Sequence, residues 1–258
     1  MRGQRVRLAA FVLVVLVAII LFVVHAARPG QKASAPTARP YKGTRAVGAL
    51  LLMRNHNEIS NHVFCTATVV SSPAGNLILT AAHCLGRIPP SKMVFVPDYG
   101  GASNHRYPYG TWRVTGQKFP PHWFPHGNVS IDFAFLMVSG DVQARTGAET
   151  IGTSSPAPSS VQLIGYTSNG EHPITCTRPP TTITVARQQQ MKFTCDGYVG
   201  AASGGPFLVN VSAKTGNGTV IGVIGGYQQG GNLPSISYSS PFGAEIKALY
   251  SRVTRNGH

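Results

Sequence analysis

Residues 197–207 read GYVGAASGGPF and hold one nucleophilic side chain, the hydroxyl of Ser203, among small residues. Small residues let a backbone turn sharply and let another molecule approach it closely. The apolar residues Phe207, Leu208 and Val209 follow, which predicts that the turn leads into a strand. Taken alone, the pattern fits an ordinary glycine-rich turn as well as a reactive serine, so the second interpretation needs partners elsewhere in the chain.

A serine hydroxyl is a weak nucleophile until a base takes its proton, and a histidine oriented by a buried carboxylate is the usual base. His83 lies in TAAHC, residues 80–84, shortly after an apolar segment. Asp132 begins the run DFAFLMV, residues 132–138. A carboxylate at the head of such a run is costly to bury unless it is hydrogen-bonded or paired. We therefore expect His83 and Asp132 to form one site with Ser203.

The segment TAAHC, the apolar strand behind Asp132 and the segment SGGP at residues 203–206 together resemble the trypsin/chymotrypsin-like serine peptidases. The resemblance covers about residues 47–253 and fits the short secreted bacterial forms better than the vertebrate digestive enzymes. The order His, Asp, Ser is that family's order, whereas subtilisin-like and α/β-hydrolase enzymes use other orders. The resemblance implies an all-β fold, with two six-stranded antiparallel β-barrels, the active site between them and a C-terminal helix.

The same resemblance implies a role for each residue of the site. Ser203 attacks a peptide or ester carbonyl, His83 takes its proton and later returns it to the leaving group, and Asp132 holds the imidazole tautomer. The backbone N–H groups of Ala201 and Ser203 hold the oxyanion. The expected activity is that of a serine endopeptidase, a hydrolase that works through an acyl-enzyme.

The resemblance places the floor of the primary substrate pocket at Gly197 and Tyr198, with a further wall at Gly225 and Gly226. No acidic residue stands at position 197, so a preference for Lys or Arg is not expected. No histidine lies in residues 224–227, which argues against a pocket specific for Glu. A neutral substrate side chain is the expectation that remains.

Ala201 and Ala202 depart from the family pattern, which usually has Gly-Asp before the serine. Ala202 has no carboxylate to receive a new N-terminal ammonium, so activation by cleavage after Arg45 is not expected. If position 201 requires a glycine-like conformation, Ala201 is strained or its N–H turns away from the oxyanion. An alternative function therefore stays open, that of a catalytically weak or inactive homologue that acts as a binding module.

The four cysteines allow three pairings. We expect Cys65–Cys84, which ties the histidine turn to the preceding strand and which the resemblance also implies. We expect Cys176–Cys195 to tie a strand back across a loop before the serine turn. Disulfides indicate an oxidising compartment. Zinc is the competing use of cysteines, but the chain lacks C-x-x-C spacing, so neither a metal nor a cofactor is expected.

Residues 1–27 have the pattern of an export segment, with three arginines before 17 unbroken apolar residues at 8–24. That run is long for a cleaved signal peptide and short for a spanning helix, so a signal peptide and a signal anchor both stay open. Residues 28–45 are predicted to be a flexible linker or pro-segment. Residues 46–258 form the predicted peptidase domain, with the junction between its barrels near 141–160. We expect a protein that is secreted or anchored to the outer face of the membrane.

The formal net charge of +14 is unevenly distributed, because residues 1–45 hold eight basic and no acidic residues. The remainder holds 14 basic and 8 acidic residues, hence +6, with no cluster of Lys or Arg interleaved with aromatic residues. Nucleic-acid binding is therefore disfavoured. The expected partner is a protein or peptide substrate, with membrane contact only through residues 8–24 if they are not cleaved, and the chain is expected to be a monomer.

Apolar alternation and turn residues predict a series of strands and one terminal helix over residues 243–253. The predicted strands are 47–53, 62–70, 76–81, 93–96, 111–119, 131–138, 161–166, 181–186, 191–195, 206–211, 219–227 and 235–239.

Overall fold

The computed structural model describes residues 34–42, 44–55, 58–101, 105–125, 127–168, 170 and 172–255. The chain divides into the units 1–34 and 35–258, and the second unit carries the fold. The apolar segment 8–24, predicted to be a signal peptide or anchor, lies outside the described residues. In the described part of the chain, no helix is both long enough and apolar enough to cross a membrane.

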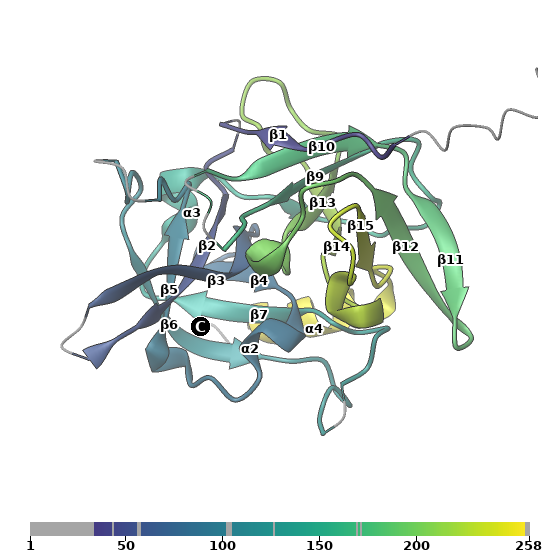
Figure 1. Ribbon diagram of the computed structural model, residues 1–258. Coiled ribbons are helices and arrows are strands. Elements are labelled where there is room, and N and C mark those ends of the chain that lie inside the picture. Colours follow the sequence, from purple (N-terminus) through teal and green to yellow (C-terminus); the bar gives the residue numbers. More distant parts are fainter. Residues whose placement is uncertain are drawn as a thin grey trace, which may run out of the picture. The chain divides into compact units, whose positions relative to one another are not determined.

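The first half of the folded unit is a closed barrel of antiparallel strands (Figure 1). β4, β5 and most of β7 are buried and consist almost wholly of apolar residues, as expected for strands that fill a barrel. In barrel order the strands are β2 (Val47–Met53), β3 (Ile59–Val69), β4 (Leu77–Thr80), β7 (Ala134–Val138), β6 (Trp112–Lys118) and β5 (Met93–Pro97).

The second half consists of two sheets instead of one closed barrel. The larger sheet has the order β1 (Arg39–Pro40), β10 (Ile174–Arg178), β9 (Val161–Gly165), β13 (Pro206–Val209), β14 (Thr219–Val223), β8 (Thr150–Ile151). The smaller has the order β11 (Thr181–Val185), β12 (Gln188–Thr194), β15 (Ile236–Ser239). A backbone bond from Gly225 N–H to the Tyr238 carbonyl at 3.0 Å joins the two sheets near the site.

Short helices connect the strands, and one longer helix ends the described chain. α4 (Ala244–Arg255) buries Ile246 and Leu249 against the core, on the apolar face that the sequence predicts. The others are α2 (Ala82–Leu85), α3 (Val142–Thr146) and the 3-10 turns η2 (Pro90–Lys92), η3 (Gly200–Ala202) and η4 (Tyr227–Gly230).

Both predicted disulfides are confirmed. Cys65–Cys84 joins β3 to α2, and Cys176–Cys195 joins β10 to the residue after β12. The second bond therefore links the two sheets of the second half.

The predicted β-rich fold and C-terminal helix are confirmed, and the strand boundaries mostly agree within a few residues. Three strands were not predicted, namely β1, β8 and β10. The expectation of a flexible segment is wrong for residues 34–42, because β1 pairs with β10 and Ala38 N–H donates to the Asp196 carbonyl at 2.8 Å. A sheet edge offers unpaired backbone groups, so a segment with few apolar residues can be ordered by backbone pairing alone. The predicted barrel junction at 141–160 contains α3 and β8 and stays a prediction.

Candidate active site

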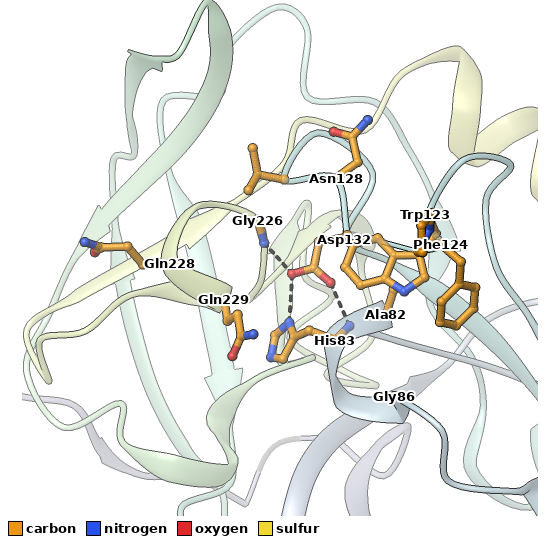
Figure 2. A pocket seen from close by; sticks show the side chains of 13 residues that line it. Ala82, His83, Gly86, Trp123, Phe124, Asn128, Asp132, Gly226, Gln228 and Gln229 are labelled. Atoms are coloured by element: carbon orange, nitrogen blue, oxygen red, sulfur yellow. Dashed lines mark hydrogen bonds and ion pairs between the residues drawn. The ribbon is translucent and has the colours of Figure 1, made fainter.

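Asp132 is a buried carboxylate whose oxygens accept three hydrogen bonds. Oδ1 accepts from the backbone N–H of His83 at 2.9 Å, and Oδ2 accepts from the His83 imidazole and from the Gly226 N–H, each at 2.7 Å. The residue is 2% exposed, so these donors replace the water that burial removes. The bonds hold the carboxylate in one orientation toward the histidine (Figure 2).

His83 lies on α2, directly after β4, and its side chain is 12% exposed. The bond between its Nδ1 and Asp132 Oδ2 assigns the ring hydrogen to Nδ1, since a carboxylate only accepts. Nε2 is then left with its lone pair, as a base requires. The disulfide of the neighbouring Cys84 fixes the helix to β3.

Ser203 follows η3 and is tied to the first barrel, because its carbonyl accepts from Thr66 N–H at 2.8 Å. Its neighbour Gly204 has a φ of 82°, and a Cβ there would lie 2.1 Å from the Thr66 carbonyl oxygen. The close approach of η3 to β3 thus requires glycine. The Ser203 hydroxyl donates to the Gln229 carbonyl at 3.5 Å. Among the described residues, no hydrogen bond joins Ser203 to His83.

Ala201, the expected oxyanion-hole residue, has its N–H bonded elsewhere. It donates to Ser168 Oγ at 3.3 Å, while the Ala201 carbonyl accepts from Thr66 Oγ1 at 2.9 Å. The positive φ of this turn, 59°, belongs to Gly200, and Ala201 has an ordinary helical conformation. The Ala201 N–H is thus hydrogen-bonded within the chain, and its role in an oxyanion hole stays a prediction.

A cavity of about 410 Å³ contains the histidine and the aspartate (Figure 2). Gln229 lies on one side of the imidazole, and Trp123 and Phe124 lie on the other. Phe124 is 53% exposed, so the segment that contains Trp123 and Phe124 presents an apolar surface to the cavity. The cavity can therefore receive a side chain through apolar contacts and main-chain or amide hydrogen bonds.

The four predicted pocket residues are not all in this cavity. Gly226 lines it, and Gly225 packs behind Asp132. The Tyr198 hydroxyl is buried and donates to the Leu163 carbonyl at 2.8 Å. A Cβ on Gly197 would lie 3.6 Å from Ala38, in the segment that contains β1. Their role in binding stays a prediction.

Sequence reasoning missed Ser168 and η4, which approach the site only through the fold. Gln228 and Gln229 both have a φ of 53°, a left-handed conformation that is unfavourable for residues with a side chain. Their surroundings offered one signal, since glycines 225, 226, 230 and 231 flank them and indicate a tight turn.

The three residues Cys65, His83 and Cys84 place possible metal ligands within 4.8 Å of one another. Both sulfurs are consumed by the disulfide. The oxidised group therefore offers a metal only the imidazole.

Comparison with known proteins was consistent with this geometry. The trypsin family model matches residues 32–240, whereas no curated protein matches the chain. The protease Anisep from Arthrobacter nicotinovorans is 22% identical, with a TM-score of 0.68 over 85% of this chain and 100% of its own. The thermostable serine protease AL20 from an extremophilic microorganism is 21% identical, with a TM-score of 0.65 over 83% and 99%.

A third structure, a Glu endopeptidase in complex with MPD, is 15% identical, with a TM-score of 0.62 over 86% of this chain and 97% of its own. At these identities the three likenesses concern the fold. The family match extends over most of the sequence, so the chain belongs to the trypsin family of serine proteases.

Proposed function

We propose that the protein is an exported serine endopeptidase that hydrolyses peptide bonds with His83, Asp132 and Ser203. Ser203 Oγ bonds to the substrate carbonyl carbon as His83 Nε2 takes its proton, and the same proton then passes to the departing amine. The resulting acyl-enzyme is hydrolysed by water, with His83 again as base. Asp132 holds the imidazole and stabilises its charged form.

The observation that carries the proposal is the bond of 2.7 Å between His83 Nδ1 and Asp132 Oδ2. The carboxylate accepts two further N–H groups, so it cannot rotate away without losing them. A histidine held in this way presents a basic Nε2 to the cavity, which is the state that activation of a serine requires.

The oxyanion hole in this proposal consists of the N–H groups of Ala201 and Ser203. The Ala201 N–H donates to Ser168 in the resting enzyme, so it must give up this bond to hold an oxyanion. One such donor typically contributes about 3 kcal/mol to the transition state, which exceeds the roughly 1 kcal/mol of the bond given up. The exchange is therefore favourable once an oxyanion forms.

The substrate preference we propose is a neutral side chain, held near Gly197, Tyr198, Gly225 and Gly226. Of these residues Gly226 lines the cavity beside His83, where Asp132 is the one acidic side chain among the described residues and its oxygens are already bonded. An arginine or lysine would find no free carboxylate there. Two disulfides support export to an oxidising compartment, with residues 1–27 as a signal peptide or anchor, and we propose that the protein acts as a monomer.

The decisive experiment is labelling of the oxidised full chain with a fluorophosphonate probe. We expect covalent labelling that is abolished in Ser203→Ala and strongly slowed in His83→Ala. Correctly folded protein that stays unlabelled over a wide range of probe concentrations would contradict the enzymatic function.

A second function, that of a binding module without turnover, is favoured by one specific pair of contacts. The Ser203 hydroxyl is bonded to the Gln229 carbonyl and the Ala201 N–H is bonded to Ser168, so both groups are engaged within the chain in the resting state. Unlabelled protein that nevertheless binds peptides at the His83 cavity would identify this function.

A further inference from the structure

Three segments far apart in the sequence, together with Asp98 and Tyr109, line a second cavity of about 550 Å³, here called the basic cavity. The segments are residues 42 and 44–45 before the first barrel, residues 144–147 at the end of α3, and residues 214, 215 and 217 after β13. The basic cavity shares no lining residue with the cavity around His83. We propose that it binds a small diphosphate-bearing anion, a ligand that the proposed proteolysis neither uses nor explains.

Charge is the first argument for an anion. The lining includes four cationic side chains, Lys42, Arg45, Arg145 and Lys214, and one carboxylate, Asp98. Within the described part of the chain, none of the four cations forms a salt bridge. Like charges gathered around one hollow repel each other, and a bound anion removes that repulsion.

One carboxylate offsets only part of the charge of four cations. Burial raises the pKa of Asp98, while the charges of His172, Arg45 and Lys42 act in the opposite direction. Asp98 lies near these cations without a direct ion pair to them in the described residues. The basic cavity therefore keeps a positive surplus.

Rigidity of part of the wall is the second argument, because donors that are already fixed lose less entropy on binding. The Arg45 guanidinium lies over the Tyr109 ring, 5.4 Å from its centre. Thr44 is buried, and its hydroxyl donates to Asn217 Oδ1 at 3.1 Å, which joins the first segment to the third. Thr146 is also buried, and its hydroxyl donates within α3 to the Val142 carbonyl at 3.0 Å.

Chemistry and size select the ligand class. Arginine binds phosphate oxygens through two parallel N–H bonds, and lysine adds a point charge. The hydroxyls of Tyr109 and Thr215 and the amide N–H₂ of Asn217 supply further donors in the same lining. A diphosphate carries several negative charges on a compact group, which matches four cations better than the single charge of a carboxylate. The volume lies within the range of small-molecule sites.

Sequence inspection alone does not reveal this site. The four cations stand at positions 42, 45, 145 and 214, so the sequence contains no basic cluster. Two contacts of the fold bring them together. Gly218 N–H donates to the buried carboxylate of Glu149, which holds the segment of Lys214 near α3, and Thr44 donates to Asn217, which holds the segment of Lys42 and Arg45 near Lys214.

The test is calorimetric titration of the oxidised full chain with inorganic pyrophosphate at low ionic strength. We expect saturable binding that weakens steeply with salt. The double variant Arg145→Gln, Lys214→Gln should lose roughly tenfold or more in affinity. The matched control is Lys247→Gln, Arg252→Gln on α4, which removes the same net charge outside the basic cavity and should bind nearly as the original chain does.

Three results would overturn the proposal: no saturable binding, an equal loss in both double variants, or tighter binding of hexaglutamate than of pyrophosphate. The second would show a diffuse charge effect, and the third a site for acidic peptides. All four cations are exposed, so their replacement should leave the thermal transition nearly unchanged. Labelling of Ser203 by a fluorophosphonate, measured on the same variants, reports separately on the proposed enzymatic function.

Discussion

Replacement of Ser168 by alanine should increase the reactivity of Ser203, although Ser168 is not proposed to contact substrate. Ser168 Oγ accepts the Ala201 N–H at 3.3 Å, the same N–H that is proposed to hold the oxyanion. Ser168→Ala removes this acceptor and leaves the rest of the turn unchanged. The resting conformation then no longer gains the free energy of the bond between Ala201 and Ser168. The conformation in which the Ala201 N–H is free to bind the oxyanion becomes more populated as a result.

The size of the effect follows from the strength of that bond. A neutral hydrogen bond of this length contributes about 1 kcal/mol net, which corresponds to a factor of about five in population. If the conformation with the Ala201 N–H free is the less populated one, its population rises by that factor, and kcat/KM rises with it. The gain is limited to roughly 10²–10³, the full contribution of one oxyanion donor.

The assay is the second-order rate constant of fluorophosphonate labelling, because it requires no knowledge of the natural substrate. The phosphonyl oxygen of the probe needs the same N–H donors as a substrate oxyanion. Ser168→Thr keeps a hydroxyl and should react like the original protein, and Ser159→Ala replaces an exposed serine elsewhere as a control. Equal rates for Ser168→Ala and the original chain, at equal thermal stability, would refute the reasoning.

Ala201→Gly separates this mechanism from backbone strain. Ala201 already has an ordinary helical conformation, so glycine relieves nothing. We expect an unchanged labelling rate and a loss of about 0.5–1 kcal/mol in stability from the added freedom of the unfolded chain. A rate increase without loss of stability would instead indicate strain in the reacting state.

Three further predictions concern the carboxylates and the N-terminal segment. Asp132→Asn places an amide N–H₂ among three N–H donors and should lower kcat/KM by roughly 10⁴, measured on a cleaved peptide. Burial raises the pKa of Glu149 to about 7, so the free energy of unfolding should fall as pH rises from about 4.5 to 7. Urea unfolding at pH 5 and pH 8 measures this fall, and Glu149→Gln should make it smaller by about 2–3 kcal/mol. A chain that begins at Ala46 should melt at a lower temperature than one that begins at Ala35 but have equal activity, because it loses β1 and gains no ammonium partner at Ala202.

Two of these predictions have a direct control. The pH dependence of Glu149 has the stated sign because the unfolded carboxyl ionises first, so protons are bound preferentially by the folded chain between the two pKa values. An identical slope in Glu149→Gln would contradict it. A large gain of activity on trimming to Ala46 would show that the new ammonium has a partner other than residue 202.

Local sequence predicts those parts of the site that depend on local structure. The segment around His83 follows a buried strand, and Asp132 precedes another, so β4 and β7, which are neighbours in the barrel, bring the two residues together. The disulfide at Cys84 joins two cysteines 19 residues apart, and the family resemblance also implies it. Apolar strands can be recognised in a single chain, whereas the pairing of strands and of cysteines needs the family resemblance as well.

The remaining features depend on contacts between distant segments. The direction of the Ala201 N–H is set by Ser168, which lies 33 residues earlier. β1 is ordered by the edge of β10, although its own composition predicts a flexible segment. The basic cavity joins residues 42 and 214, whose proximity no periodicity encodes. Such features follow from the complete fold and are therefore absent from motif reasoning.

In the proposed mechanism, substrate binding exchanges two hydrogen bonds of the resting site. The Ser203 hydroxyl donates to the Gln229 carbonyl. The backbone of Gln228 and of Gln229 is in the left-handed conformation, which costs roughly 1–2 kcal/mol for each residue. This strain favours release of η4, whereas the bond to Ser203 opposes it by about 1 kcal/mol. The strain of the two residues together is larger than this one opposing bond, so a small part of the substrate's binding energy suffices to free the hydroxyl. The Ala201 N–H adds a second exchange of similar size, and both can be completed only when a substrate carbonyl is present to accept the released N–H group.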